Sequence, residues 1–250
     1  MTSWMRFGGA MVAVASAVSL YGGAALADPA GDAALAKVDG AMNRASTQYF
    51  EYDVTNQEPG KGEGKLALVV RLKGDKRLTE FTAPADMKGT KVLILSPSEM
   101  YVYLPAFGKV RRIASSVGDQ GFMGMTFSQD DNVTRYGDRY QAVVSSDAAA
   151  EMKLTLTPKA GMATPYGKIE ITVAKDRMLP TQLKYFNAGG THVKTESRTG
   201  YSCQGDICTA SDQTMVDHTK SNAQTKLTRK TWKVNESMSD DLFSKRALEK

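Results

Sequence analysis

The sequence predicts a mainly β protein with one long helix near its N-terminal end, in which an antiparallel sheet curls into a barrel or half-barrel. From Gln48 onward, apolar and polar residues alternate with the period of two that is typical of strands. Turn-forming residues divide this part of the chain into roughly ten segments at hairpin-like spacing. Because one helix covers little of the apolar face of such a meander, we expect the sheet to curl on itself.

Residues 1–27 have the features of a secretory signal peptide. Arg6 supplies the positive charge, residues 11–20 form a short apolar run, and Ala25-Leu26-Ala27 has the small-x-small pattern of a cleavage site. A membrane anchor is the alternative, but Gly and Ser interrupt the run, which falls short of the ~20 apolar residues that a span needs. We therefore expect cleavage after Ala27 and export.

Residues 28–250 are long enough for a single domain with a sizeable core. Once Arg6 leaves with the signal peptide, 31 basic residues stand against 27 acidic ones. This mild excess suits an anionic membrane surface or an acidic partner, although many solvated surfaces carry a similar excess. Basic residues spread this evenly along an exported chain argue against a nucleic-acid partner.

The expected elements are one helix, a series of strands and a short terminal helix. The long helix is expected at residues 28–47, with Asp32 as its cap and an apolar stripe at Leu35, Val38, Ala41, Met42 and Ala45. Residues 133–136 and 140–144 are candidates for short edge elements, and Ser239 is the expected N-cap of the terminal helix. Strands are expected at residues 49–54, 66–72, 77–82, 92–95, 100–104, 152–156, 169–173, 183–187, 191–201, 207–216 and 223–234.

The two cysteines, Cys203 and Cys208, flank a predicted hairpin. A two-residue turn at Gly205-Asp206 would place the cysteines opposite each other, one rung away from the turn. Opposed residues of a hairpin have the separation that a disulfide needs. A zinc site is the alternative, but the nearest His, His218, is ten residues beyond Cys208 and has no second His close by. We therefore predict a disulfide, which agrees with an oxidising compartment.

Catalytic motifs are absent from the sequence. Its two histidines, His192 and His218, lie in no recognisable motif, and the Gly-x-Ser-x-Gly elbow of serine hydrolases does not occur. The glycine-rich segment at residues 60–64 lies between two predicted strands rather than before a helix, so it is not a phosphate loop. Asp130-Asp131 lacks the ligand spacing of a calcium loop. We therefore predict no enzyme, no metal and no cofactor; a lipid hydrolase, which would need an essential serine, is a minor alternative.

Residues 84–131 carry motifs that resemble those of the outer membrane lipoprotein-sorting proteins, the LolA-like carriers. The matching segments are Pro84-Ala85-Asp86, Lys88-Gly89-Thr90, Tyr103-Leu104-Pro105-Ala106, residues 109–116 and Phe122-Met123-Gly124, with a weaker match at residues 242–249. One departure concerns the residues after Gly124. The family usually continues with Ser-Asp-Phe, whereas this chain has Met125-Thr126-Phe127 and so lacks the acidic group.

The resemblance implies a LolA/LolB-like incomplete antiparallel β-barrel, or half-barrel, with an N-terminal helix and a helical or flap lid. It also implies a periplasmic carrier that binds lipid or lipoprotein acyl chains and moves them between the inner and outer membranes. The partners would be an inner-membrane transporter, for which the RND type is one candidate, and an outer-membrane acceptor; we expect a monomer. The alternative is a protein-binding envelope sensor, or an adaptor of an export pump, that uses the same fold.

The candidate site residues belong to an apolar cavity and its cover. Residues 122–127, named the flap here, offer Phe122, Met123, Met125 and Phe127. Met adapts to varied apolar shapes, so these side chains suit a cover for acyl chains, although they could also be permanent core. Arg111 and Arg112 are candidate headgroup contacts or solvated hairpin ends, and at most one of them can face the cavity because they are adjacent in a strand. The expected cavity wall comprises Leu66, Leu68, Val70, Leu93, Leu95, Met100, Val102 and Leu104.

Overall fold

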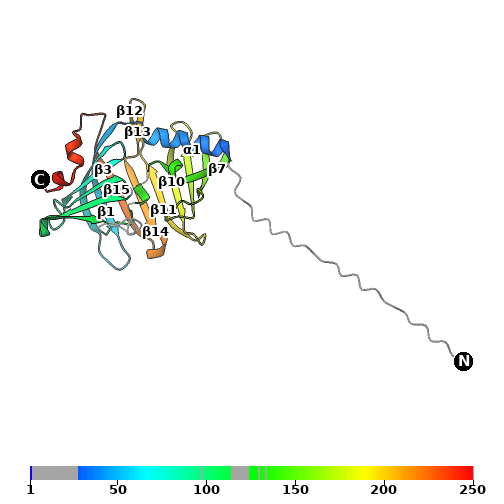
Figure 1. The fold of residues 1–250 in the computed structure, drawn as a ribbon, viewed down its shortest axis with the longest axis horizontal. Coiled ribbons are helices and arrows are strands. Elements are labelled where there is room, and N and C mark those ends of the chain that lie inside the picture. Colours follow the sequence, from blue (N-terminus) through cyan, green and yellow to red (C-terminus); the bar gives the residue numbers. More distant parts are fainter. Residues whose placement is uncertain (2–27, 97, 114–123, 129, 133, 250) are drawn as a thin grey trace.

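In the computed structural model, one large antiparallel sheet accounts for most of the fold (Figure 1). The structure describes residues 1, 28–96, 98–113, 124–128, 130–132 and 134–249. The predicted signal peptide, except Met1, therefore lies outside the described residues. In the described part of the chain, no helix is long and apolar enough to cross a membrane.

The main sheet of the described residues has thirteen strands in the order β6-β5-β4-β3-β2-β1-β15-β14-β11-β10-β9-β8-β7. The sheet is open, with β6 and β7 as its edges, so the prediction of a mainly β fold with an N-terminal helix is confirmed and full closure does not occur. The strands are β1 Thr47–Gln57, β2 Gly64–Lys73, β3 Lys76–Ala83, β4 Lys91–Ser96, β5 Glu99–Leu104, β6 Lys109–Ile113, β7 Tyr140–Asp147, β8 Glu151–Pro158, β9 Lys168–Ala174, β10 Leu179–Phe186, β11 His192–Thr199, β14 Asp212–Asp217 and β15 Ala223–Val234.

Strands β1 and β15 join the two halves of the chain at the middle of the sheet. Their antiparallel register runs from the Gln48–Val234 pair to the Gln57–Gln224 pair, with one irregularity after Glu51. From β1 the chain meanders outward to β6, and from β7 it returns through β11 and β14 to β15. The centre of the sheet thus pairs the first strand of the chain with its last strand.

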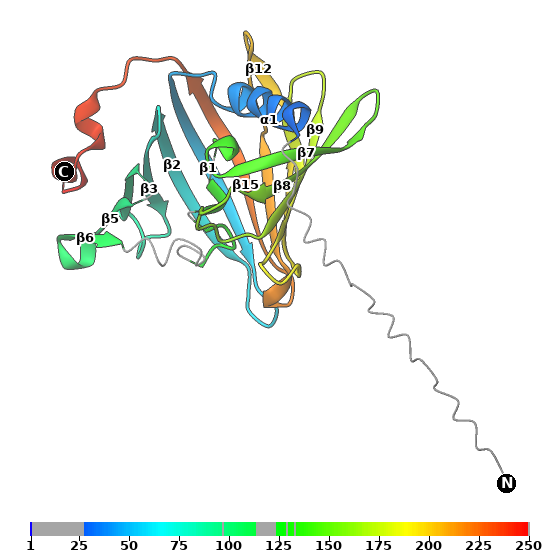
Figure 2. The same cartoon turned by 45° about the vertical axis from the view of Figure 1, so that its right-hand side comes forward.

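Helix α1, Pro29–Met42, lies across the β7 end of the sheet (Figure 2). Its N-cap is Asp28, whose side chain accepts a hydrogen bond from the Ala30 N–H, so the prediction of Asp32 as the cap was wrong. Asp32 instead accepts from the Ala142 N–H of β7 at 2.8 Å. Both carboxylates bond to β7, because Asp28 also accepts from the Val144 N–H. The helix ends at Met42 rather than at residue 47, because Thr47 already belongs to β1.

The sheet has two faces, which are distinguished by what covers them. On the inner face, Leu35 and Val38 of α1 pack against Leu154, Ile171 and neighbouring residues of β7–β10. Further along the same face, the cluster of β1–β3 comprises Phe50, Tyr52, Val54, Leu68, Val70 and Phe81. Strand pairing links the two regions across the sheet, through the opposed residues Ile171, Leu183, Glu196 and Met215.

The C-terminal segment covers the outer face of β3–β5. Leu78, Leu93 and Tyr101 are opposed across these strands, and Phe243 and Leu248 pack on them. The segment contains the 3-10 turn η6, Asp240–Phe243, and the short helix α2, Lys245–Leu248 (Figure 2). The Ser239 hydroxyl accepts from the Asp241 N–H and caps η6, whereas the helix α2 is capped by Ser244. The prediction of Ser239 as a cap thus holds for the 3-10 turn and not for the terminal helix.

Short elements complete the described part of the fold. Residues 140–144 belong to the edge strand β7, as predicted, whereas residues 136–138 form a 3-10 turn instead of an edge strand. The remaining 3-10 turns are η1 Pro105–Phe107, η3 Asp130–Asn132, η4 Tyr136–Asp138 and η5 His218–Lys220.

The disulfide hairpin consists of β12, Ser202–Gln204, and β13, Ile207–Thr209. Cys203 pairs with Cys208 across it and the two are disulfide-bonded, so this prediction is confirmed. Gly205 in the turn has φ +63°, a conformation that glycine adopts without steric cost. The sequence did not predict the position of the hairpin in the fold. The buried Ile207 and the half-buried Cys208 form part of a pocket wall on the inner face.

Candidate functional site

Three adjoining pockets occupy the inner face between the end of α1, strands β1–β5 and residues 125–139. The largest has a volume of about 340 Å³ and reaches from Met42 and Leu72 to the apolar side chains Ile94, Leu95 and Met100. The second, about 130 Å³, lies between β1–β3, β11 and the disulfide hairpin. The third, about 30 Å³, lies under Met125 and Phe127.

The pockets adjoin one another, since they share wall residues. The two larger pockets share Met42, Gln48, Leu72, Arg77, Asn132 and Thr134. Arg77 and Asn132 also line the third pocket. The volume of about 340 Å³ is at the lower end of the range for pockets that hold small molecules. The arrangement is therefore a row of adjoining pockets with mixed polar and apolar walls, and Arg77 lines each of them.

Strand pairing explains why these side chains point into one space. Leu72 is opposite Arg77, Arg77 is opposite Ile94, and Ile94 is opposite Met100. Opposed residues of neighbouring strands share a face. The pocket wall thus crosses β2, β3, β4 and β5 along one row.

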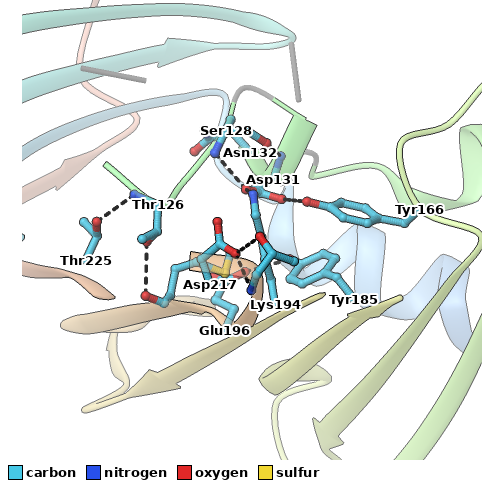
Figure 3. Close-up of polar contacts among 12 residues, drawn as sticks. Thr126, Ser128, Asp131, Asn132, Tyr166, Tyr185, Lys194, Glu196, Asp217 and Thr225 are labelled. Carbon is cyan, nitrogen blue, oxygen red and sulfur yellow. Dashed lines mark hydrogen bonds and ion pairs between the residues drawn. The ribbon is translucent and has the colours of Figure 1, made fainter. Parts of the chain in front are cut away.

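Residues 124–128, the described end of the flap and the residue after it, lie against the inner face (Figure 3). The Thr126 N–H donates to the Thr225 hydroxyl at 2.8 Å, and the Thr126 hydroxyl donates to the Met215 carbonyl at 3.1 Å. Phe127 is buried in the same cluster as Leu35 and Val38 of α1. This end of the flap is therefore attached to β14 and β15 and belongs to the core.

Asp131 attaches the following residues to β11 (Figure 3). Its carboxylate accepts from the Ser128 N–H at 2.7 Å, from the Lys194 ammonium at 2.7 Å and from the Tyr166 hydroxyl. Burial raises the pKa of Tyr166, and the Asp131 carboxylate raises it further, so this phenol stays protonated as a donor. A loop that precedes β7 is thus held to a strand far along the chain by a buried ion pair.

A second buried ion pair lies next along β11. Glu196 accepts from the Arg198 guanidinium at 2.6 Å and from the Tyr185 hydroxyl at 2.8 Å. Burial raises the pKa of Tyr185, as does the neighbouring Glu196. Lys194, Glu196 and Arg198 alternate in β11 with Thr195 and Ser197, so all three charged groups point toward the inner face.

Tyr52 lies among arginine side chains at the wall of the second pocket. Burial raises the pKa of Tyr52 to about 12, against the opposing charges of Arg77, Arg229 and Arg198. Burial also lowers the pKa of Arg77 and of Arg229. Of these arginines, Arg198 is paired with Glu196. Among the described residues, Arg77 and Arg229 form no ion pair, so two of the three arginines around Tyr52 have no carboxylate partner.

Comparisons with known proteins identify the family. A family model described as "Uncharacterized protein" matches residues 73–250, more than two thirds of the chain. The chain belongs to that family. No protein of curated function matches the sequence.

Solved structures match the fold over nearly their whole length. A DUF1329 family protein from Desulfovibrio piger has a TM-score of 0.80 at 24% identity, with 88% of this chain and 98% of that chain covered. A putative outer membrane lipoprotein-sorting protein domain from Vibrio parahaemolyticus has a TM-score of 0.79 at 21% identity, with 88% and 99% covered. A LolA superfamily protein from Nitrosomonas europaea has a TM-score of 0.71 at 18% identity, with 87% and 98% covered. The predicted resemblance to lipoprotein-sorting proteins is thus confirmed at the level of the fold.

The predicted wall residues divide into three groups. Leu68, Val70, Leu95 and Met100 line the pockets, as do Met125 and Phe127 of the flap. Leu66 packs against the β1–β3 cluster without lining a pocket, and Val102 and Leu104 of β5 also line none of the three. Phe122 and Met123 lie outside the described residues.

Leu93 and the two arginines of β6 require correction. Leu93 lies on the outer face under Phe243, because it is adjacent to the inward-facing Ile94 in a strand whose two faces are both apolar. Arg111 and Arg112 are exposed on the edge strand, where Arg111 lies over the Phe107 ring and Arg112 donates to the Ser98 carbonyl. Neither arginine lines any of the three pockets.

Sequence reasoning missed the buried charged residues of the site, namely Arg77, Asp131, Lys194, Glu196 and Arg198. One pattern could have revealed part of this set. Lys194, Glu196 and Arg198 alternate in β11 with residues that are also polar, so whichever face of this strand is buried must bury polar groups. In the described part of the chain, no group of three or more His, Cys, Asp or Glu side chains is arranged to hold a metal ion.

Proposed function

We propose that the protein is a periplasmic carrier that binds the acyl chains of a lipid or lipoprotein and moves them between the inner and outer membranes. The observation that carries the proposal is the row of adjoining pockets on the inner face, the largest of which has a volume of about 340 Å³ and an apolar wall at Leu72, Ile94, Leu95 and Met100. The likeness in fold to a putative lipoprotein-sorting domain and to a LolA superfamily protein supports it. The N-terminal segment, which has the features of a signal peptide, supports export to the periplasm.

Burial of acyl chains would supply the driving force. Each methylene that moves from water into an apolar pocket contributes about 0.8 kcal/mol. In this proposal the sheet acts as a half-barrel, α1 covers one end, and the flap lies over the pocket as a lid. The anchored end of the lid, Thr126 and Phe127, would stay fixed while the cargo enters beside it. An inner-membrane transporter would deliver the cargo and an outer-membrane acceptor would remove it.

Native mass spectrometry of the protein purified from its own periplasm tests the proposal. We expect a copurified lipid or lipoprotein, which organic extraction releases. A second arm measures transfer of a fluorescent phospholipid from donor to acceptor vesicles with and without the protein. A lipid-free protein that accelerates no transfer, but copurifies with a polypeptide, would instead favour the envelope sensor or adaptor. Release of free fatty acid from the vesicles would indicate a hydrolase.

A further inference from the structure

Arg77 of β3 is a partly buried cation without a partner. Within the described residues its guanidinium makes no hydrogen bond and no ion pair, and Tyr52 is the one titratable group that acts on it. The other charged side chains beside the pocket differ in this respect, since Lys194 is paired with Asp131 and Arg198 with Glu196. A guanidinium that loses water on burial and gains no acceptor is costly. Such a group is expected where a ligand supplies the acceptor.

Two further donors without acceptors lie near Arg77. The Tyr52 hydroxyl, at the wall of the same pocket, makes no hydrogen bond to the described residues. The Nη1 group of Arg229 is buried and also has no hydrogen-bond partner. Both Arg77 and Arg229 act electrostatically on Tyr52, so the three groups surround one region. Buried polar groups are almost always bonded in proteins, and the buried Nη1 group of Arg229 is an exception. The Arg77 guanidinium and the Tyr52 hydroxyl line the pocket, where a ligand can supply the acceptor that they lack in the protein.

The surroundings of Arg77 define the shape of that acceptor. Arg77 lines all three pockets, and the largest of them extends from it toward Ile94, Leu95 and Met100. A ligand whose anionic end contacts Arg77 could therefore place an apolar tail in the 340 Å³ pocket. Guanidinium groups bind carboxylate and phosphate through two parallel hydrogen bonds.

We propose that Arg77, with Tyr52, binds the carboxylate or phosphate headgroup of an anionic amphiphile whose tail lies along the apolar wall of the adjoining pocket. This inference rests on the proposed function and specifies the chemical class of the cargo. It assigns headgroup recognition to the interior of the sheet, whereas the exposed Arg111 and Arg112 of the edge strand take no part in it. The site needs no covalent step, because the ligand enters and leaves intact.

Displacement of Nile red, an uncharged fluorescent dye, tests the inference with matched ligands. Dodecyl phosphate and dodecanoate carry the headgroup, dodecanol carries the same tail without charge, and inorganic phosphate carries the charge without a tail. With the wild-type protein we expect both anions to displace the dye at concentrations about tenfold or more below that of dodecanol. In Arg77→Met this preference should vanish while dodecanol binds as before. Arg77→Lys should keep part of the preference, and the exposed control Arg112→Met should keep all of it.

The outcomes separate the headgroup site from the carrier function. Because Arg77 makes no ion pair, its replacement breaks none. Arg77→Met should therefore fold, which a thermal melt checks. A folded Arg77→Met that still prefers the anions over dodecanol would overturn the headgroup site and leave the carrier intact. If inorganic phosphate displaced Nile red as well as dodecyl phosphate does, the ligand would be a free anion rather than an amphiphile. Failure of Nile red and of all three dodecyl compounds to bind would count against the carrier function itself.

Discussion

The carboxylate of Asp131 and the ammonium of Lys194 lie 2.7 Å apart although 63 residues separate them in the chain. The Asp131 side chain is fully buried and that of Lys194 is 10% exposed. Because the Ser128 N–H and the Tyr166 hydroxyl also donate to Asp131, its charge is well compensated. The pair attaches the loop after the flap to β11, and its position beside the pocket connects the stability of the fold with the shape of the site.

We expect Asp131→Asn to lower the free energy of unfolding by about 3–5 kcal/mol, because it leaves the Lys194 ammonium buried without a counter-charge. The exposed ion pair between Arg135 and Asp75 provides the control, since its side chains are 49% and 77% exposed. Asp75→Asn should cost less than about 1 kcal/mol. Urea unfolding of the two variants gives both values, and equal losses would show that the buried pair stabilises no more than a surface pair.

Leu242 and Phe243 are adjacent in the C-terminal segment but differ in how far they are exposed. Phe243 is 4% exposed on the outer face of β3–β5, whereas Leu242 is 37% exposed. We expect Phe243→Ala to cost about 3–5 kcal/mol of stability and Leu242→Ala to cost little. Chemical denaturation measures both. If Phe243→Ala left the unfolding midpoint unchanged, the segment would be a loose tail rather than part of the core.

The period of two allowed the sequence to predict most strands, because strands such as β8 and β9 carry large apolar residues on one face only. This period could not predict which residues of β4 face the pocket. Val92, Leu93, Ile94 and Leu95 are all apolar, so the pattern does not distinguish the face under Phe243 from the face toward the pocket. The assignment depends on the C-terminal segment, which lies more than a hundred residues further along the chain.

The charged part of the site could not be predicted for a related reason. Charged residues in a strand are ordinarily exposed, and Lys194 and Glu196 are buried only because Asp131 and Arg198 pair with them. For Lys194, the partner comes from a loop with no regular pattern. Arg77 has no partner in the described chain, so no pairing pattern in the sequence indicates it.

The disulfide closes a hairpin with a sequence separation of only five residues. A short loop removes little entropy from the unfolded chain, so the Cys203→Ser, Cys208→Ser double variant should lose less than the ~3 kcal/mol of a 15-residue loop. Alkylation followed by mass measurement should label two thiols after reduction and none before it. Labelling of both cysteines without a reductant would contradict the bond.

Asp212 makes stability depend on pH in the acid range. Hydrogen bonds from Lys226 at 2.8 Å and from Ser211 at 2.7 Å lower the pKa of Asp212 from its ordinary value of 3.8. A carboxyl whose folded pKa lies below its unfolded pKa stabilises the fold above the unfolded value and loses that contribution as the pH falls through the folded value.

We therefore expect Asp212→Asn to melt below the wild type at about pH 6 and to approach it as the pH falls through the folded pKa of Asp212, because below that pKa the wild-type carboxyl is protonated in both states. Thermal melts across this range measure the difference. A gap that stays constant down to the lowest pH would mean that the charge of Asp212 does not contribute. Asp53, an exposed acid paired with the exposed Lys230, is the matched control, and its replacement by Asn should change the melting temperature little.

Variants of Phe127 and Met125 distinguish the contribution of the flap to the core from its contribution as a cover of the pocket. Phe127 is 6% exposed and packs with Leu35 and Val38, whereas Met125 is only partly buried at the pocket wall. We expect Phe127→Ala to cost about 3–5 kcal/mol of stability, as truncation of a buried aromatic residue does. Met125→Ala should cost less and should mainly weaken displacement of Nile red by dodecanol, since it removes apolar contact from the ligand. Thermal melts and dye displacement, measured on both variants, test these two expectations. If Met125→Ala lowered stability as much as Phe127→Ala and left dodecanol binding unchanged, this end of the flap would be core alone, and the cover of the pocket would have to lie elsewhere in the chain.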